Sequence, residues 1–121
     1  MNKTNNWKTG QIGENLAAKY LLDQGYEILS RNYRTRFGEI DIICKHNDIY
    51  IFVEVKTKIG DQFGTPEEMI NRSKIAKVLK MASVYLTKES LGNPPCRLDA
   101  VAIVLDSDLN LVTLHHYPCI T

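Results

Sequence analysis

Residues 38–56 read GEIDIICKHNDIYIFVEVK, in which two nearly continuous apolar runs flank a short polar segment. Such β-branched runs are typical of strands that are buried on both faces of a sheet. Asn47 and Asp48 tolerate the left-handed backbone of a two-residue turn, so we expect them at the tip of a hairpin in which His46 faces Ile49. These residues are therefore predicted to form an antiparallel pair at the centre of the fold.

Three charged residues interrupt the apolar hairpin. Asp41 lies in the first run, and Glu54 and Lys56 lie at the end of the second. Counting outward from the turn places Asp41 opposite Glu54, where the Cβ atoms of facing residues are about 4.5–5.5 Å apart. Glu54 and Lys56 are two residues apart and share a face of their strand, while Val55 points the other way. Two carboxylates and an ammonium group are thus predicted to converge.

Carboxylates this close repel each other, so the cluster requires a counter-charge. Mg²⁺ or Mn²⁺ binds through one or two carboxylates and keeps several waters, which suits Asp41 and Glu54 with the Val55 carbonyl as a third ligand. Such a metal polarises a phosphodiester and acidifies a bound water, and Lys56 would orient that water or offset charge on the phosphate. The alternative is a structural salt-bridge network of the three charged side chains. We favour the metal site, because hydrophobic residues could replace a purely structural network without loss.

Six short stretches carry a resemblance to known proteins. An aspartate on one strand followed by Glu-x-Lys on the next is similar to the core of the PD-(D/E)XK nucleases. The wider pattern resembles the YraN-like family of bacterial proteins, which is related to archaeal Holliday-junction resolvases. The matching stretches are GQIGE at 10–14, RNYR at 31–34, GEID at 38–41, FVEVK at 52–56, FG at 63–64 and RLD at 97–99.

The resemblance implies a restriction-endonuclease-like fold with Asp41, Glu54 and Lys56 as the core catalytic residues and Glu14 as an accessory acid. It also implies a branched-DNA substrate. One position departs from the signature, since Ile40 stands where the signature nominally carries proline. From the residues alone, Glu14 borders the apolar stripe of a helix and either leans toward the sheet or lies exposed in a first turn, where the helix dipole favours it.

The remaining sequence predicts an α/β fold, a mixed β-sheet of about five strands flanked by helices in the order α-β-β-β-α-β-β. We expect a single domain over residues 1–121, with a flexible tail at residues 1–8. The predicted elements outside the hairpin are a helix over residues 12–21 ended by Gly25, a strand over 26–34, a helix that begins with the capping box at 65–68 and bends near 71–73, and strands over 96–105 and 109–115.

Composition narrows the class of protein. The 121 residues are 44% hydrophobic and 24% charged, as in soluble globular domains. No run approaches the roughly 20 apolar residues of a membrane span, and the polar start lacks a signal peptide, so we expect a cytoplasmic protein without a membrane partner. The three cysteines are predicted to be reduced, with Cys44 in the core, and the three histidines show no zinc pattern.

The distribution of charged residues limits where nucleic acid could bind. The net charge is only +1, so local clusters must supply the phosphate contacts. Arg34 and Arg36 precede the acidic strand, and Lys74 borders the apolar stripe of the second helix, from where it could reach the carboxylates. These three residues are predicted to contact DNA. Trp7 and Phe37 could stack on bases, although aromatic residues in tails and loops more often pack against the protein.

The leading interpretation is a Mg²⁺- or Mn²⁺-dependent endonuclease-like protein that acts on DNA, with branched DNA suggested by the resemblance. The alternative is a module that binds nucleic acid or a protein partner and retains the site without efficient cleavage, which the weak overall charge favours. A third interpretation is a structural protein with a salt-bridged hairpin. Symmetric cutting of a junction would favour a homodimer, because each site handles one strand.

Overall fold

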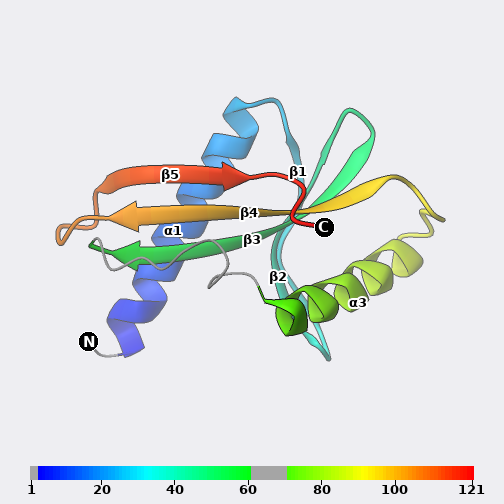
Figure 1. Ribbon diagram of the computed structural model, residues 1–121, viewed down its shortest axis with the longest axis horizontal. Coiled ribbons are helices and arrows are strands. Elements are labelled where there is room, and N and C mark those ends of the chain that lie inside the picture. The colour runs from blue at the N-terminus through cyan, green and yellow to red at the C-terminus, as the bar shows by residue number, and fades with distance from the viewer. Residues whose placement is uncertain (1–2, 61–70) are drawn as a thin grey trace.

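The computed structural model describes residues 3–60 and 71–121 and has the α/β order that the sequence predicts (Figure 1). The predicted capping box at 65–68 and the Phe63-Gly64 stretch lie outside the described residues. Helix α3 begins at Arg72, and the Asn71 side chain caps it by accepting a 2.8 Å hydrogen bond from the Lys74 N–H. The elements are α1 (Lys3–Asp23), β1 (Glu27–Thr35), β2 (Gly38–His46), β3 (Ile49–Ile59), α3 (Arg72–Lys88), β4 (Cys96–Leu105) and β5 (Leu111–Tyr117).

The five strands form one mixed sheet in the spatial order β1-β2-β3-β4-β5. Only the β3–β4 pair among them is parallel, and it extends from Tyr50↔Cys96 to Ile59↔Leu105. A parallel pair needs a crossover connection, and the chain makes this one through α3. The mixed sheet confirms the predicted fold class.

The β2–β3 hairpin has the predicted turn and register. Asn47 and Asp48 have φ angles of 50° and 64°, the left-handed conformation expected at a two-residue turn. The register pairs His46 with Ile49 and continues to Ile42↔Val53. Alternation therefore gives each strand one set of apolar residues for each face of the sheet.

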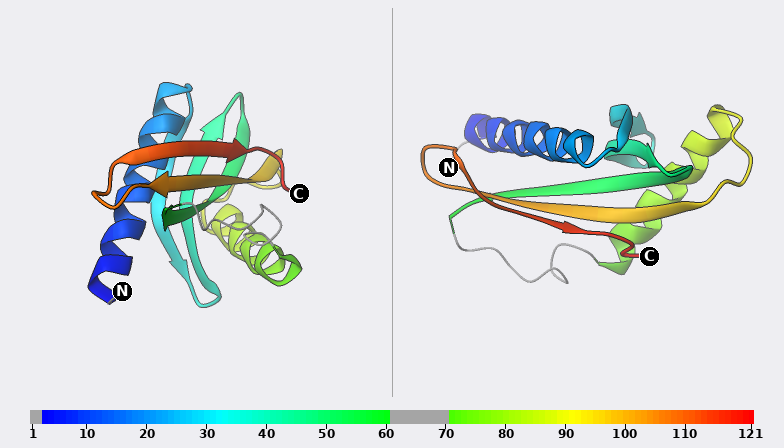
Figure 2. Two further views of the ribbon diagram at one scale, coloured as in Figure 1. Left: turned by 60° about the vertical axis from the view of Figure 1, so that its left-hand side comes forward. Right: turned by 90° about the horizontal axis from the view of Figure 1, so that it is seen from above.

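The two helices cover opposite faces of the sheet (Figure 2). Helix α1 packs on the face that carries Ile42 and Val53, and α3 packs on the face that carries Ile43 and Phe52. The fully buried side chains of both layers come mainly from β2, β3 and β4, which explains why these strands are nearly all apolar.

Helix α1 begins at Lys3 and therefore includes most of the residues predicted to form an N-terminal tail. A helix whose later turns are packed extends easily, because each added residue gains a hydrogen bond without a new nucleation step. The predicted stop is confirmed. Gly25 has φ 90°, and the Tyr26 N–H donates to Leu21 O at 2.9 Å in a Schellman-type end. Within the described residues, neither helix is long and apolar enough to cross a membrane.

A fully buried carboxylate, Asp99, joins β4 to β5 and to the C-terminal residues. His116 Nε2 lies 2.7 Å from Asp99 Oδ2, and Arg97 Nε and the Cys119 N–H each donate to Oδ1 at 2.9 Å. His116 Nδ1 lies 3.0 Å from the Tyr20 hydroxyl of α1. Burial alone would raise the pKa of Asp99, but the hydrogen bonds from His116, Arg97 and Cys119 outweigh it and lower that pKa. The network is fully satisfied, so the buried charge stabilises the packing of these segments.

Cys44 lies in the core, as predicted. Its side chain is fully buried, and the S–H donates to Ile51 O at 3.6 Å. Burial raises the pKa of the Cys44 thiol to about 12, with a further contribution from the charge of Asp99. Cys96 and Cys119 are exposed free thiols.

Candidate functional site

The regular pairing of β2 is interrupted on both sides at Asp41. On the β3 side the ladder runs as far as Ile42↔Val53, and the Val55 N–H instead donates to Asp41 Oδ2 at 2.7 Å. On the β1 side, Arg31 pairs with Ile42 and Tyr33 with Ile40, which leaves Asn32 opposite Asp41. Asn32 has a φ of 53°, an uncommon conformation that clusters at functional sites.

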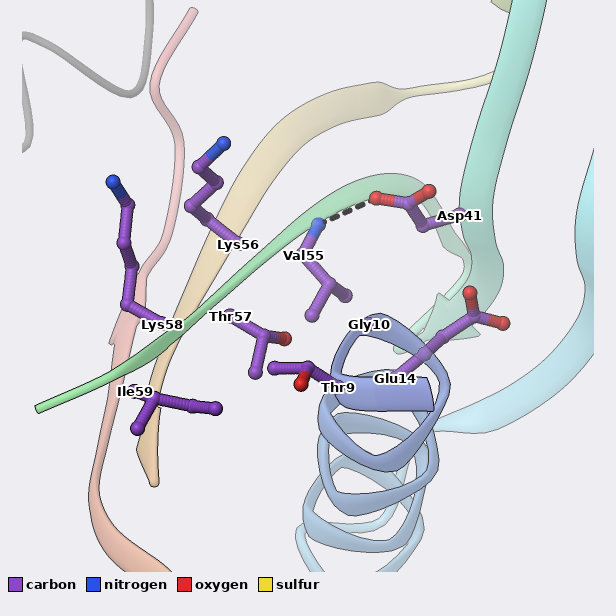
Figure 3. A pocket seen from close by; sticks show the side chains of 9 residues that line it. All are labelled: Thr9, Gly10, Glu14, Asp41, Val55, Lys56, Thr57, Lys58 and Ile59. Carbon is purple, nitrogen blue, oxygen red and sulfur yellow. Dashed lines mark hydrogen bonds between the residues drawn. The ribbon is translucent and has the colours of Figure 1, made fainter. Parts of the chain in front are cut away.

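The interruption changes which way the side chains of β2 face. Ile42 packs on the α1 side of the sheet, whereas Ile40, two residues earlier, packs on the α3 side. Regular alternation would put both on one side, so the strand rotates at Asp41. The Asp41 side chain consequently lies at the opening between β2 and β3 and faces α1 (Figure 3).

Asp41 lines a cavity of about 520 Å³, here called the acidic cavity. The walls come from α1, β2 and the C-terminal half of β3, and Glu14 of α1 lies across from Asp41 (Figure 3). The residues that line it are Thr9, Gly10, Glu14, Asp41, Val55, Lys56, Thr57, Lys58 and Ile59.

The acidic cavity raises the pKa of Asp41 to about 7. The largest cause is burial, followed by repulsion from Glu54, and Glu14 contributes in the same direction. The hydrogen bond from the Val55 N–H and the positive charge of Lys74 oppose these effects. Carboxylates whose pKa is raised to near neutral pH are typical of sites that bind a cation or take part in catalysis.

Glu14 is fixed in place rather than exposed in a first turn. Its side chain is only 12% exposed, and its Oε1 atom accepts hydrogen bonds from Arg31 Nε at 3.1 Å and Asn32 Nδ2 at 3.0 Å. Arg31, considered from the sequence as a phosphate contact beside Arg34 and Arg36, instead binds Glu14 together with Asn32, and both residues belong to the RNYR stretch that carries the resemblance. Their contacts identify them as residues that position Glu14.

Gly13 brings α1 close enough to place Glu14 in the cavity. A Cβ atom added at Gly13 would overlap the Thr57 side chain of β3, so only glycine permits this approach. Gly10 also lines the acidic cavity, but a Cβ added there would meet open space. The GQIGE stretch therefore combines a helix–strand contact at Gly13 with a carboxylate, Glu14, that lines the acidic cavity.

Glu54 faces the opposite side of the sheet from the acidic cavity. Its Oε2 atom lies 2.9 Å from Lys74 Nζ of α3, as the sequence predicts for Lys74. Both residues line a second cavity of about 340 Å³, the lysine cavity, together with Phe37, Asn71 and Lys77. Asp41 and Glu54 interact electrostatically, but they do not line a common cavity, which corrects the expected convergence. The rotation of β2 at Asp41 is the reason.

Lys56 lies at the junction of the two sides. It lines the acidic cavity and also a narrow pocket beside Glu54 and Lys74. Its side chain extends away from the Asp41 carboxylate, on the side of β3 opposite Thr57 (Figure 3). In the described part of the chain, no three His, Cys, Asp or Glu side chains are close enough together to hold a metal ion by themselves.

The other predicted DNA contacts already have partners. Arg34 Nε lies 3.6 Å from Glu39 Oε2 in an exposed ion pair. The Arg36 guanidinium lies over the Phe37 ring, 5.0 Å from its centroid, and Phe37 packs against the core beneath α3. Of the two aromatic residues considered for stacking, Phe37 therefore packs, while Trp7 remains 68% exposed.

Comparison with known proteins assigns the family. The model of the "Uncharacterised protein family UPF0102" matches residues 13–103. The chain belongs to this family. The UPF0102 protein of Syntrophus aciditrophicus (strain SB) is 43% identical over 102 residues, which cover 84% of this chain and 80% of the relative. UPF0102 protein CD630_12710 of Clostridioides difficile (strain 630) is 45% identical over 101 residues, 84% of this chain and 89% of the relative.

Membership of UPF0102 confirms the family named from the sequence motifs. The matched segment contains Glu14, Asp41, Glu54 and Lys56, and it includes both sides of the site. His116 and Cys119, which bind Asp99, lie beyond it.

Proposed function

We propose that this UPF0102 protein is a Mg²⁺- or Mn²⁺-dependent nuclease that cleaves DNA at the acidic cavity. One observation carries the proposal: Asp41 lines a cavity large enough for a phosphate group, and burial, followed by repulsion from Glu54 and Glu14, raises its pKa to about 7. A bound cation would relieve this repulsion. The likeness of the Asp41 and Glu54-Val55-Lys56 pattern to PD-(D/E)XK nucleases supports the same chemistry.

The donor atoms fit a hard divalent cation. Asp41 Oδ2 is held by Val55 and Glu14 Oε1 by Arg31 and Asn32, and the second oxygen of each carboxylate accepts no hydrogen bond from the described residues. Mg²⁺ and Mn²⁺ take oxygen ligands and retain waters, so they need no complete protein cage. Asp41, Glu14 and the Val55 carbonyl line the acidic cavity and would hold the ion there, whereas Glu54, predicted as a ligand, faces the other side of the sheet and would favour the ion only through its negative charge. Such an ion supplies Lewis acidity and an acidified water.

The protein's own groups orient the reaction. Asp41 is fixed by a backbone donor, so its free oxygen keeps one direction at the cavity wall. Lys74 neutralises Glu54 across the lysine cavity, and its ammonium group would contact a phosphate oxygen of DNA bound on that side. The Lys56 side chain is long and flexible, so its amine would turn toward the phosphate. In the cleavage reaction it would offset the negative charge of the phosphate.

The second candidate is a module that binds DNA or a protein partner without efficient cleavage. The orientation of Lys56 favours it, because the amine extends away from Asp41 (Figure 3). The ion pairs of Arg34 and Lys74 also leave little free positive charge at the site.

Two measurements test the proposal and separate the candidates. Calorimetric titration of the metal-free protein with Mn²⁺ should show binding that Asp41→Asn abolishes. Linear, flapped and four-way DNA should then be incubated with Mg²⁺ or Mn²⁺ and wild type, Asp41→Asn or Lys56→Ala. Products that need Mn²⁺, Asp41 and Lys56 support the nuclease. Metal and DNA binding without products supports the module, and products equal in all three proteins exclude catalysis by this site.

A further inference from the structure

We propose that the exposed indole of Trp7 is a stacking platform for an unpaired base of a DNA strand that leads into the acidic cavity. The proposal rests on the proposed function for DNA as the ligand. It deepens that function by naming single-stranded or unpaired DNA as the form that is bound.

Trp7 is the most exposed large hydrophobic side chain in the described residues, at 68%. It lies on α1 with Gln11 and Glu14, and the spacing of four and three residues puts all three on one side of the helix. Trp7 is therefore about two helical turns away from Glu14 along a single stripe. A tryptophan side chain that leaves most of its surface in solvent gains little stability from its position.

A groove of about 410 Å³ connects Trp7 to the site. We call it the tryptophan groove, and it is lined by Trp7, Gln11 and Glu14 of α1 and by Arg31, Asn32 and Arg34 of β1, with Glu39 of β2 at its edge. Glu14 lines both this groove and the acidic cavity. The tryptophan groove and the cavity of Asp41 thus meet at Glu14.

The groove also offers positive charge for a phosphate. The Arg34 side chain is 84% exposed, and its pair with Glu39 is a solvent-exposed contact at 3.6 Å. Exposed pairs of this kind contribute little stability, so Arg34 can exchange Glu39 for a phosphate oxygen at small cost. Arg31 is committed to Glu14 and is not available in this way.

The chemistry of the groove favours an unpaired base over other occupants. An aromatic face beside arginine is the arrangement that binds single strands, where each base offers its own face for stacking. A duplex keeps its bases stacked inside, so it would gain nothing from the indole. An apolar protein segment would need a contiguous hydrophobic surface, whereas the other residues of the groove are polar or charged.

Trp7 is the single tryptophan of the chain, which makes its fluorescence a direct measure of stacking. The full chain should be titrated in EDTA, where metal-dependent cleavage cannot occur, with an oligothymidine of about ten nucleotides and with a blunt duplex of the same length. We expect saturable quenching by the single strand and little by the duplex. Equal quenching by both would overturn the proposal.

Variants provide the second measurement, the anisotropy of a labelled oligothymidine. Trp7→Ala should weaken single-strand binding by roughly tenfold, and Trp7→Phe should restore most of it. Leu22→Ala is the matched control, because Leu22 is 56% exposed at the other end of the same helix. An unchanged affinity for oligothymidine in Trp7→Ala would overturn the proposal. If Trp7→Ala altered only the sedimentation coefficient, Trp7 would instead contact a second copy of the chain, and the proposal would also be overturned. Quenching that persists in Asp41→Asn while cleavage is absent would separate this binding site from the nuclease proposal.

Discussion

The Val55 N–H donates a 2.7 Å hydrogen bond to the Asp41 carboxylate at the point where β2 and β3 stop pairing through their backbones. A side-chain oxygen thus takes the place of a strand carbonyl. The bond stabilises the ionised form of Asp41 and partly offsets the burial and the repulsion that raise its pKa. It also ties the orientation of the carboxylate to the backbone of the strand that carries Glu54 and Lys56.

Replacing Asp41 by Asn should stabilise the metal-free protein as pH rises. The folded pKa of about 7 exceeds the ordinary value of 3.8, so the folded state holds the proton more tightly than the unfolded chain. The stability from this proton is complete below pH 3.8 and is lost as pH rises through about 7. Asn does not titrate, so the advantage of Asp41→Asn over wild type should be roughly 2–3 kcal/mol larger at pH 8 than at pH 5.

Urea unfolding in EDTA at the two pH values measures this difference. Added Mn²⁺ should then stabilise wild type at pH 8 and leave Asp41→Asn unchanged. A stability difference that is independent of pH would contradict the assigned environment of Asp41.

The two glycines of the GQIGE stretch should respond in opposite directions to alanine. Gly13→Ala forces α1 away from Thr57 and should reduce the free energy of unfolding by roughly 2–3 kcal/mol. Gly10→Ala meets open space and should raise it by roughly 0.5–1 kcal/mol, because alanine favours the helix. Midpoints of urea unfolding report both changes, and similar midpoints for the two variants would show that α1 does not approach β3 this closely.

Lys74→Ala should have opposite effects on metal binding and on DNA binding. The Lys74 ammonium lies 2.9 Å from Glu54 and competes with a cation for the carboxylates. Its removal should raise the affinity for Mn²⁺ roughly three- to tenfold and weaken DNA binding through the loss of a phosphate contact.

Lys77→Ala is the control, since Lys77 lines the same lysine cavity and should affect DNA binding alone. Calorimetry and filter binding measure the two affinities. Parallel losses of metal and DNA affinity in Lys74→Ala would indicate a structural role for the ion pair instead.

Asp99→Asn should destabilise the fold although it lies outside the proposed site. Asp99 is fully buried and balances Arg97, so loss of its charge leaves a largely buried guanidinium without a counter-ion, at a cost of about 3 kcal/mol. Asp23→Asn removes an exposed pair with Lys19 and should cost less than about 0.5 kcal/mol. Thermal unfolding of both variants tests the contrast, and equal melting temperatures would refute it.

The fold was predictable because the hairpin sequence specifies its own geometry. Asn47 and Asp48 fix the turn, and the alternating apolar residues fix the register as far as Ile42↔Val53. The Gly25 helix end and the reach of Lys74 to Glu54 also follow from local patterns. These features depend on periodicity, which the sequence displays directly.

The site was only partly predictable because it depends on departures from periodicity. The rotation of β2 at Asp41 separates the cavity of Asp41 from that of Glu54, and the alternation of residues along the strand does not predict this rotation. The clamp on Glu14 arises from Asn32 in a left-handed conformation, which a strand assignment cannot anticipate. Arg31 reaches Glu14 across seventeen residues of sequence, so its role emerges only from tertiary structure.

The three cysteines differ in their accessibility to alkylating reagents, and this difference reports on opening of the core. Two thiols, those of Cys96 and Cys119, are open to an alkylating reagent, while the Cys44 thiol is closed inside the sheet and kept protonated. The third alkylation can therefore proceed only when the strands around Cys44 separate. The rate of this third alkylation measures how often the centre of the protein opens, without denaturant.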